Sequence, residues 1–139
     1  MTKRRRGSRT ARLHPSRLTS HRPFEELVDD ALGTIPMPFA AALDEVAIVI
    51  ADEPSAAQRR DEGMRPDETL YGLYEGVPRT DYGADWVEVP NRITLFRLPL
   101  EADFPDPDEL ADEVWVTVVH ELAHHLGIDD DRLHELGVD

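Results

Sequence analysis

The segment from Asp106 to Gly127 constrains the fold of this chain more than any other, because it carries both end signals of one long helix. Asp106 suits the N-cap position, Pro107 the first helical position and Glu109 the third. Gly127 can end the helix, since glycine tolerates the left-handed conformation found there. Between these signals, apolar residues recur every four positions and form a stripe: Leu110, Val114, Val118, Leu122 and Leu126. Trp115 and Val119 widen this apolar stripe on one side. The segment therefore predicts a helix that packs one apolar face against a sheet.

The last turns of this helix contain the pattern H-E-x-x-H, formed by His120, Glu121 and His124. Residues four apart lie on one helix face with their Cβ atoms about 5–6 Å apart. Both imidazoles can therefore bind one ion at the Zn–N distance of about 2.0–2.1 Å. Glu121 is rotated by about 100° from His120, where its carboxylate can reach a metal-bound water. This flank of the helix, which also carries Glu113 and Thr117, is expected to face a cleft.

A catalytic zinc usually has three protein ligands and one water, so one further ligand is needed. A chain reversal at Gly127 would bring Asp130 back beside the histidines, and aspartate oxygen is an ordinary zinc ligand. We therefore predict that Zn²⁺ is bound by His120, His124 and Asp130. Three neighbouring carboxylates remain as alternatives to Asp130: Asp129, Asp131 and Glu135. A helix face with two solvated histidines and a capping glycine is the simpler alternative to a metal site.

The whole pattern H-E-x-x-H-x-x-G-x-x-D, from His120 to Asp130, resembles the Asp-zincin metallopeptidases. More closely, residues 120–137 resemble the mini-zincin family of small bacterial zinc metallopeptidases, and residues 70–78 and 91–97 extend the resemblance over about 24–137. The resemblance implies a minimal zincin-like α+β domain in which both histidines and the aspartate bind zinc and Glu121 is the general base. No methionine follows Met64, so the Met-turn of the metzincins is missing.

The resemblance implies hydrolysis of peptide bonds by a zinc-activated water, with Glu121 passing the proton to the leaving amine. A chain of 139 residues offers only a shallow cleft, so a short peptide or an unfolded protein is the expected substrate. A non-catalytic zinc-binding interaction module is the alternative function.

The rest of the chain predicts an N-terminal helix and a small mixed or antiparallel sheet. Phe24 to Leu32 has helical spacing. Residues 46–51 form a continuous β-branched run, typical of a strand buried on both faces. Residues 69–75 and 91–98 are expected to form a hairpin with a long excursion, and the second strand is a candidate sheet edge for pairing with a peptide. The remaining segments are predicted to be a solvated loop (52–69), a second loop (79–89) and a final helical turn (131–136).

Several further side chains invite a functional interpretation. His125 is rotated by about 100° from His124 towards the core, so we expect a packed histidine that hydrogen-bonds a backbone carbonyl, with an auxiliary role at the site as the alternative. Four aromatic residues could either line substrate subsites or pack in the core and loops: Tyr71, Tyr74, Tyr82 and Trp86.

The charge divides the chain into a basic tail and an acidic body. Residues 1–22 hold eight basic residues and no acidic one, so the body, residues 23–139, must carry −22 to give the net charge of −14. Such a body repels polyanions, and no nucleic-acid partner is expected for it. The tail is expected to be a disordered, solubilising extension. Its cluster of three arginines, residues 4–6, could alternatively bind nucleic acid, an anionic lipid surface or an acidic partner. No apolar run suits a signal peptide or a membrane span, so we expect a cytoplasmic protein.

Overall fold

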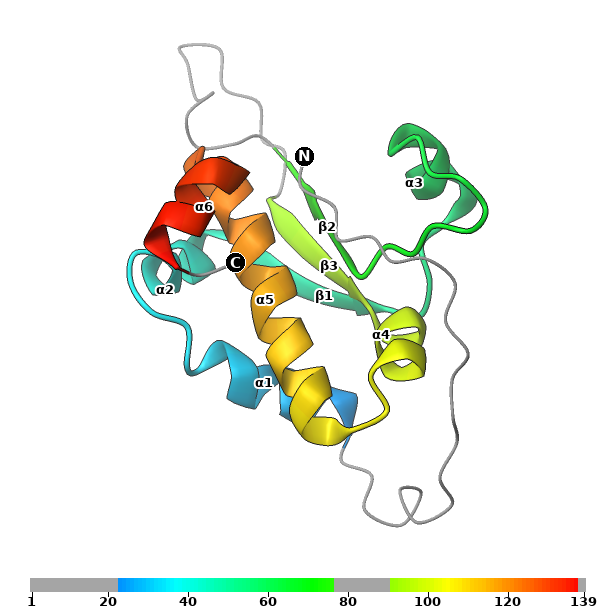
Figure 1. Ribbon diagram of the computed structural model, residues 1–139, viewed down its shortest axis with the longest axis horizontal. Helices are drawn as coiled ribbons and strands as arrows, with labels where there is room; N and C mark the ends of the chain where they lie inside the picture. Colours follow the sequence, from blue (N-terminus) through cyan, green and yellow to red (C-terminus); the bar gives the residue numbers. More distant parts are fainter. Residues whose placement is uncertain (1–22, 77–90, 138–139) are drawn as a thin grey trace.

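The computed structural model describes residues 23–76 and 91–137, which form an α+β fold around a three-stranded sheet (Figure 1). The strands are β1 (Ala47–Ala51), β2 (Gly72–Glu75) and β3 (Arg92–Phe96), in the order β1-β3-β2. β1 runs parallel to β3, whereas β2 runs antiparallel to it. The predicted basic tail 1–22 and the predicted loop 79–89, with Tyr82 and Trp86, lie outside the described residues.

One long helix, α5 (Pro107–Leu126), lies across one face of the sheet (Figure 1). The other helices are α1 (Phe24–Leu32), α2 (Phe39–Ala42), the 3-10 turn η2 (Leu43–Glu45), α3 (Ala56–Asp61), α4 (Arg97–Asp103) and α6 (Asp130–Leu136). The predicted bounds of α1 are confirmed, and its buried face packs against α5. Among the described residues, no helix combines the length and apolar character that a membrane span requires.

The predicted end signals of α5 are confirmed. The Asp106 side chain accepts hydrogen bonds from the backbone N–H groups of Asp108 and Glu109, and Gly127 ends the helix in the left-handed conformation with φ 74°. The predicted flank of Glu113 and Thr117, however, is buried instead of facing a cleft. At Thr117 the reason is close packing on β2, because a Cβ added at Gly72 would lie 2.5 Å from Cγ2 of Thr117.

Two expectations for the sheet are corrected. The predicted pairing of 69–75 with 91–98 is confirmed as β2 with β3, but β3 is the central strand and not an edge, because β1 pairs along its other side. The strand also ends at Phe96, and α4 begins at Arg97. The Arg97 guanidinium holds this corner by bonding Asp52 and Glu101, each at 2.8 Å.

The segment around β1 also differs from its prediction. A strand buried on both faces was expected, but β1 is an edge of the described sheet and Val49 is 40% exposed. The following segment, expected to be a loop, contains the short helix α3. Its start is a capping box, in which Ser55 and Gln58 each accept a hydrogen bond from the backbone N–H of the other.

The core has two parts, one on each face of the sheet. The main cluster joins α1, α2 and α5 to the sheet through residues such as Tyr74 and Ile93. Leu73 points to the opposite face, since side chains alternate along a strand. There it packs with Leu70 and Phe96 under the segment that contains α3. The candidate site therefore lies on the main-cluster face, where the end of α5 meets β2.

Candidate metal centre

The two histidines of the motif lie on the last two turns of α5, where both side chains are half-buried. The pKa of His124 is lowered from its ordinary 6.5 to about 4, chiefly by burial and in part by the neighbouring His120, while the charge of Asp130 opposes the shift. His124 is therefore neutral at physiological pH. A neutral imidazole is the form that binds metal ions.

The chain reverses after α5 as the sequence predicts. The backbone N–H of Ile128 donates to the carbonyl oxygen of Ala123 at 2.8 Å, and this bond closes the turn at Gly127. The helix α6 then starts at Asp130, one residue before the final helical turn expected over 131–136, and ends at Leu136 as expected. Buried Leu133 anchors α6 against the core, so the start of α6 stays beside the end of α5.

The candidate carboxylates in and next to α6 have different roles. Asp129 caps α6, because its Oδ1 accepts from the backbone N–H of Arg132 at 2.8 Å. Glu135 forms an ion pair with Arg132 at 2.9 Å. The charge of Asp130 instead acts on the pKa values of both His124 and Glu121. Of these three carboxylates, Asp130 is the one that is electrostatically coupled to the motif.

Glu121 is buried, with 1% of its surface exposed, and is held by the backbone of β2. Its Oε1 accepts a 2.7 Å hydrogen bond from the N–H of Tyr74. In the antiparallel pair, Tyr71 and Leu73 face β3, so the N–H of Tyr74 points away from β3 and towards α5. Glu121 therefore lies at the edge of β2 that faces away from β3, where no other strand of the described residues pairs.

Burial raises the pKa of Glu121 well above its ordinary value of 4.5. The hydrogen bond from Tyr74 opposes this shift, whereas the charges of Glu62 and Asp130 add to it. Glu62 is itself buried, with 8% of its surface exposed, and comes from the end of α3. The influence of Glu62 on Glu121 was not predicted, because the segment 52–69 was expected to be a solvated loop.

Two imidazoles and one carboxylate are a donor set that suits Zn²⁺. Within residues 23–76 and 91–137, however, no three histidine, aspartate or glutamate side chains are grouped closely enough to hold one metal ion. The structure thus brings His120, His124 and Asp130 to the same end of the domain without joining them at a single point. The types of donor fit zinc, and the ligand set stays a prediction.

Behind the motif lies a second set of polar side chains that the sequence did not identify. His125 is fully buried, as predicted, but the expected backbone carbonyl is not its partner. Its Nε2 lies 2.7 Å from Oε1 of Glu45, and its Nδ1 lies 3.1 Å from the Tyr74 hydroxyl. In the sequence, this polar set was indicated only by His125 next to the motif, since Glu45 is 80 residues away along the chain.

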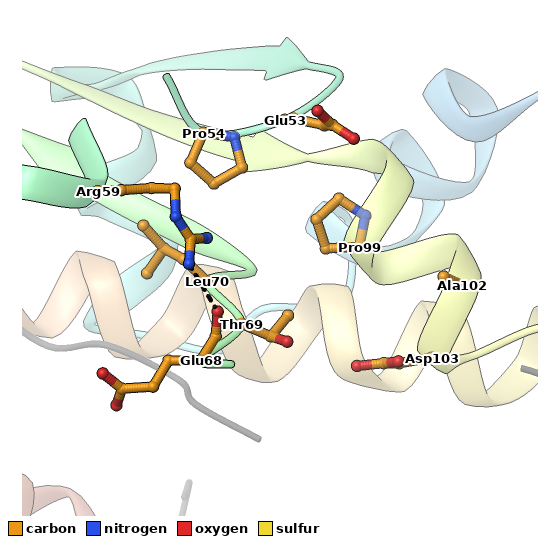
Figure 2. A pocket seen from close by; sticks show the side chains of 9 residues that line it. All are labelled: Glu53, Pro54, Arg59, Glu68, Thr69, Leu70, Pro99, Ala102 and Asp103. Atoms are coloured by element: carbon orange, nitrogen blue, oxygen red, sulfur yellow. Dashed lines mark hydrogen bonds between the residues drawn. The ribbon is translucent and has the colours of Figure 1, made fainter. Parts of the chain in front are cut away.

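One pocket of the described structure lies elsewhere, between the segment around α3 and helix α4, and Figure 2 shows its lining. Its volume is about 420 Å³. Arg59 spans one side and donates to the carbonyl oxygens of Arg65 and Glu68, at 3.0 and 3.2 Å. The residues that line the pocket include none of the predicted ligands and not Glu121.

The comparisons with known proteins point to one family. The family model of the zincin-like metallopeptidases matches residues 43–138, which include all three strands, the H-E-x-x-H motif and Asp130. No curated protein matches the chain. The match covers more than half of the 139 residues. The chain therefore belongs to the zincin-like metallopeptidase family.

Proposed function

We propose that this protein is a zinc-dependent metallopeptidase in which His120, His124 and Asp130 hold Zn²⁺ and Glu121 is the general base. Membership of the zincin-like family supports peptidase chemistry in general. The neutral state of His124 and the electrostatic coupling of Asp130 to the motif support the ligand set. When bound, zinc supplies a Lewis acid that polarises a carbonyl group and makes a water molecule acidic near neutral pH.

The observation that carries the proposal is the environment of Glu121. Its carboxylate is buried beside the histidines and held by one hydrogen bond, which leaves Oε2 for a second partner. Because burial raises its pKa, Glu121 is a better proton acceptor than an exposed glutamate. It can therefore take a proton from the attacking water and give it to the leaving amine nitrogen.

A peptide or an unfolded protein fits this site as substrate. Glu121 lies at the edge of β2 that faces away from β3, and an extended peptide can pair with such an edge through backbone hydrogen bonds. A peptide that follows this edge passes directly beside Glu121. The expected pairing edge is thus β2, in place of the strand 91–98 suggested by the sequence.

The proposal is tested by measuring zinc content and peptide cleavage of the full chain. Glu121→Gln is the matched variant, since the amide oxygen can still accept from Tyr74 while the base is removed. We expect one zinc ion per chain in both proteins and cleavage of a peptide library by the wild type alone. Equal cleavage by both proteins would contradict the role of Glu121. Zinc binding without cleavage by the wild type would favour the non-catalytic zinc-binding module.

A further inference from the structure

Four segments distant in sequence meet at the buried imidazole of His125. Its Nε2 bonds Glu45 at the end of η2, and its Nδ1 bonds the hydroxyl of Tyr74 on β2. The same hydroxyl lies 3.1 Å from Oδ1 of Asn91, directly before β3. The rings of Tyr74 and His125 also contact each other, with centroids 5.8 Å apart. One chain of polar groups thus links α5 to β2 and to the residues that precede β1 and β3.

The chemistry of the partners fixes the direction of one bond. A carboxylate can only accept, so Nε2–H of His125 donates to Glu45. The Tyr74 hydroxyl has one proton, which it donates either to Oδ1 of Asn91 or to Nδ1 of a neutral imidazole. If the imidazole is protonated, Nδ1–H donates to the hydroxyl oxygen and the hydroxyl donates to Asn91. In either case the Tyr74 ring is held in one orientation by His125.

Tyr74 connects this chain to the proposed base. Its side chain is bonded to His125, and its backbone N–H is bonded to Oε1 of Glu121 at 2.7 Å. Both bonds belong to one residue, so the hydrogen bond at the hydroxyl anchors the same residue whose amide holds the carboxylate. Glu121 and His125 also stand four residues apart on α5, so the two bonds join the same helix face to β2.

We infer that Glu45, His125 and Tyr74 form a positioning chain, which sets the position of the Glu121 carboxylate through the Tyr74 amide. For catalysis, this inference rests on the proposed peptidase function. Small displacements of a reacting group lower the rate strongly without changing how the substrate is bound. Loss of the chain should therefore lower kcat while KM and zinc content stay unchanged.

Tyr74→Phe and Glu45→Ala test the inference. The first removes the hydroxyl that bonds His125 and Asn91, the second removes the partner of His125 Nε2, and both leave every residue of the proposed metal site. Tyr71→Phe is the matched control, because Tyr71 is an equally buried tyrosine whose hydroxyl bonds Asp103, away from Glu121. We expect kcat to fall about tenfold in the first two variants, with KM within about twofold. Glu45→Gln keeps an accepting oxygen and should restore most of the rate. Wild-type kcat in both test variants, or an equal loss in Tyr71→Phe, would overturn the inference.

A second readout needs no enzymatic activity and therefore separates this inference from the proposed function. In the metal-free full chain, hydrogen exchange of the Tyr74 amide reports its bond to Glu121 directly. Glu121→Ala is the positive control and should abolish the protection. Tyr74→Phe and Glu45→Ala should speed exchange of this amide about tenfold relative to the Leu73 amide, which faces β3. Unchanged protection in both variants would overturn the positioning role, whether or not the wild type cleaves peptides.

Discussion

The backbone N–H of Tyr74 lies 2.7 Å from Oε1 of Glu121, so strand β2 and helix α5 are joined at the proposed base. The bond stabilises a carboxylate that burial otherwise disfavours, since burial raises the pKa of Glu121 well above 4.5. The metal-free fold therefore carries a buried acidic group whose charge is only partly compensated. The free-energy cost of burying this charge is typical of groups retained for chemistry and not for stability.

The first prediction concerns the pH dependence of this cost. A raised pKa in the folded state gives stability that is complete below the unfolded-state value of 4.5 and is lost as pH rises through the folded-state pKa. Glu121→Gln removes the titration and keeps the acceptor for Tyr74. The metal-free variant should therefore have a higher Tm than the wild type at pH 8, with a difference that disappears near pH 4.

Thermal unfolding of both proteins from pH 4 to pH 8 measures this difference. Glu135→Gln, which changes an exposed carboxylate on α6, is the control for the removal of one negative charge. A lower Tm for Glu121→Gln at pH 8 would show that the buried charge is not destabilising.

The second prediction concerns His124 and has the opposite direction. Its pKa is lowered from 6.5 to about 4 in the folded state, so its contribution to stability is complete above pH 6.5 and is lost as pH falls towards 4. His124→Gln should remove this acid sensitivity from the metal-free protein. His134→Gln, which removes an exposed imidazole on α6, is the control and should keep it. Urea unfolding at several pH values between 4 and 7 measures the effect. The same change in the free energy of unfolding with pH in all three proteins would refute the prediction.

The third prediction tests the close packing of β2 on α5. A Cβ at Gly72 would lie 2.5 Å from Cγ2 of Thr117, so Gly72→Ala should destabilise the protein by about 1–3 kcal/mol. Adding Thr117→Ser removes the clashing methyl group and should recover part of this loss. Gly33→Ala is the control, because a Cβ there makes only ordinary contacts at 3.5 Å and beyond. Urea denaturation provides the measurement, and additive losses in the double variant would argue against the contact.

The fourth prediction separates the effect of the turn after α5 on zinc binding from the stability cost of alanine in the left-handed conformation. Gly127 and Gly137 end α5 and α6 with φ 74° and 73°, so alanine at either position should cost about 1 kcal/mol. Only Gly127 leads the chain back to Asp130. Gly127→Ala should therefore weaken zinc binding about tenfold or more, while Gly137→Ala should not. Zinc titration of both variants tests this difference, and equal affinities would remove the turn from the metal site.

The sequence predicted the parts of the fold that depend on local signals. Helices α1 and α5 were identified because apolar spacing and the Asp106 and Gly127 caps act within one segment. The order of the strands was not predictable in the same way, since the pairing of β1 with β3 depends on contacts between residues more than 40 positions apart, such as Ile48 and Ile93. The helix α3 was missed because its many charged residues resemble those of a loop, although Ser55 and Gln58 form its capping box.

The same division holds at the site. His120, Glu121 and His124 were identified because the motif lies within two helical turns. The partners Glu45, Tyr74 and Asn91 come from three other segments, and no pattern along the chain relates them to His125. The close approach of α5 to β2 at Thr117 also depends on the absence of a side chain at Gly72, two residues before Tyr74 on the same strand.

The most direct test of the central claim is a crystal structure of the zinc-loaded full chain with anomalous scattering at the zinc edge. The account predicts one ion bound by His120, His124 and Asp130, with Glu121 still bonded to the Tyr74 amide and not coordinating the metal. The parallel variant Asp130→Ala should lower zinc affinity, whereas Asp131→Ala should not. A zinc ion bound without either histidine, or an Asp130 carboxylate turned away from an ion that the histidines hold, would contradict the account.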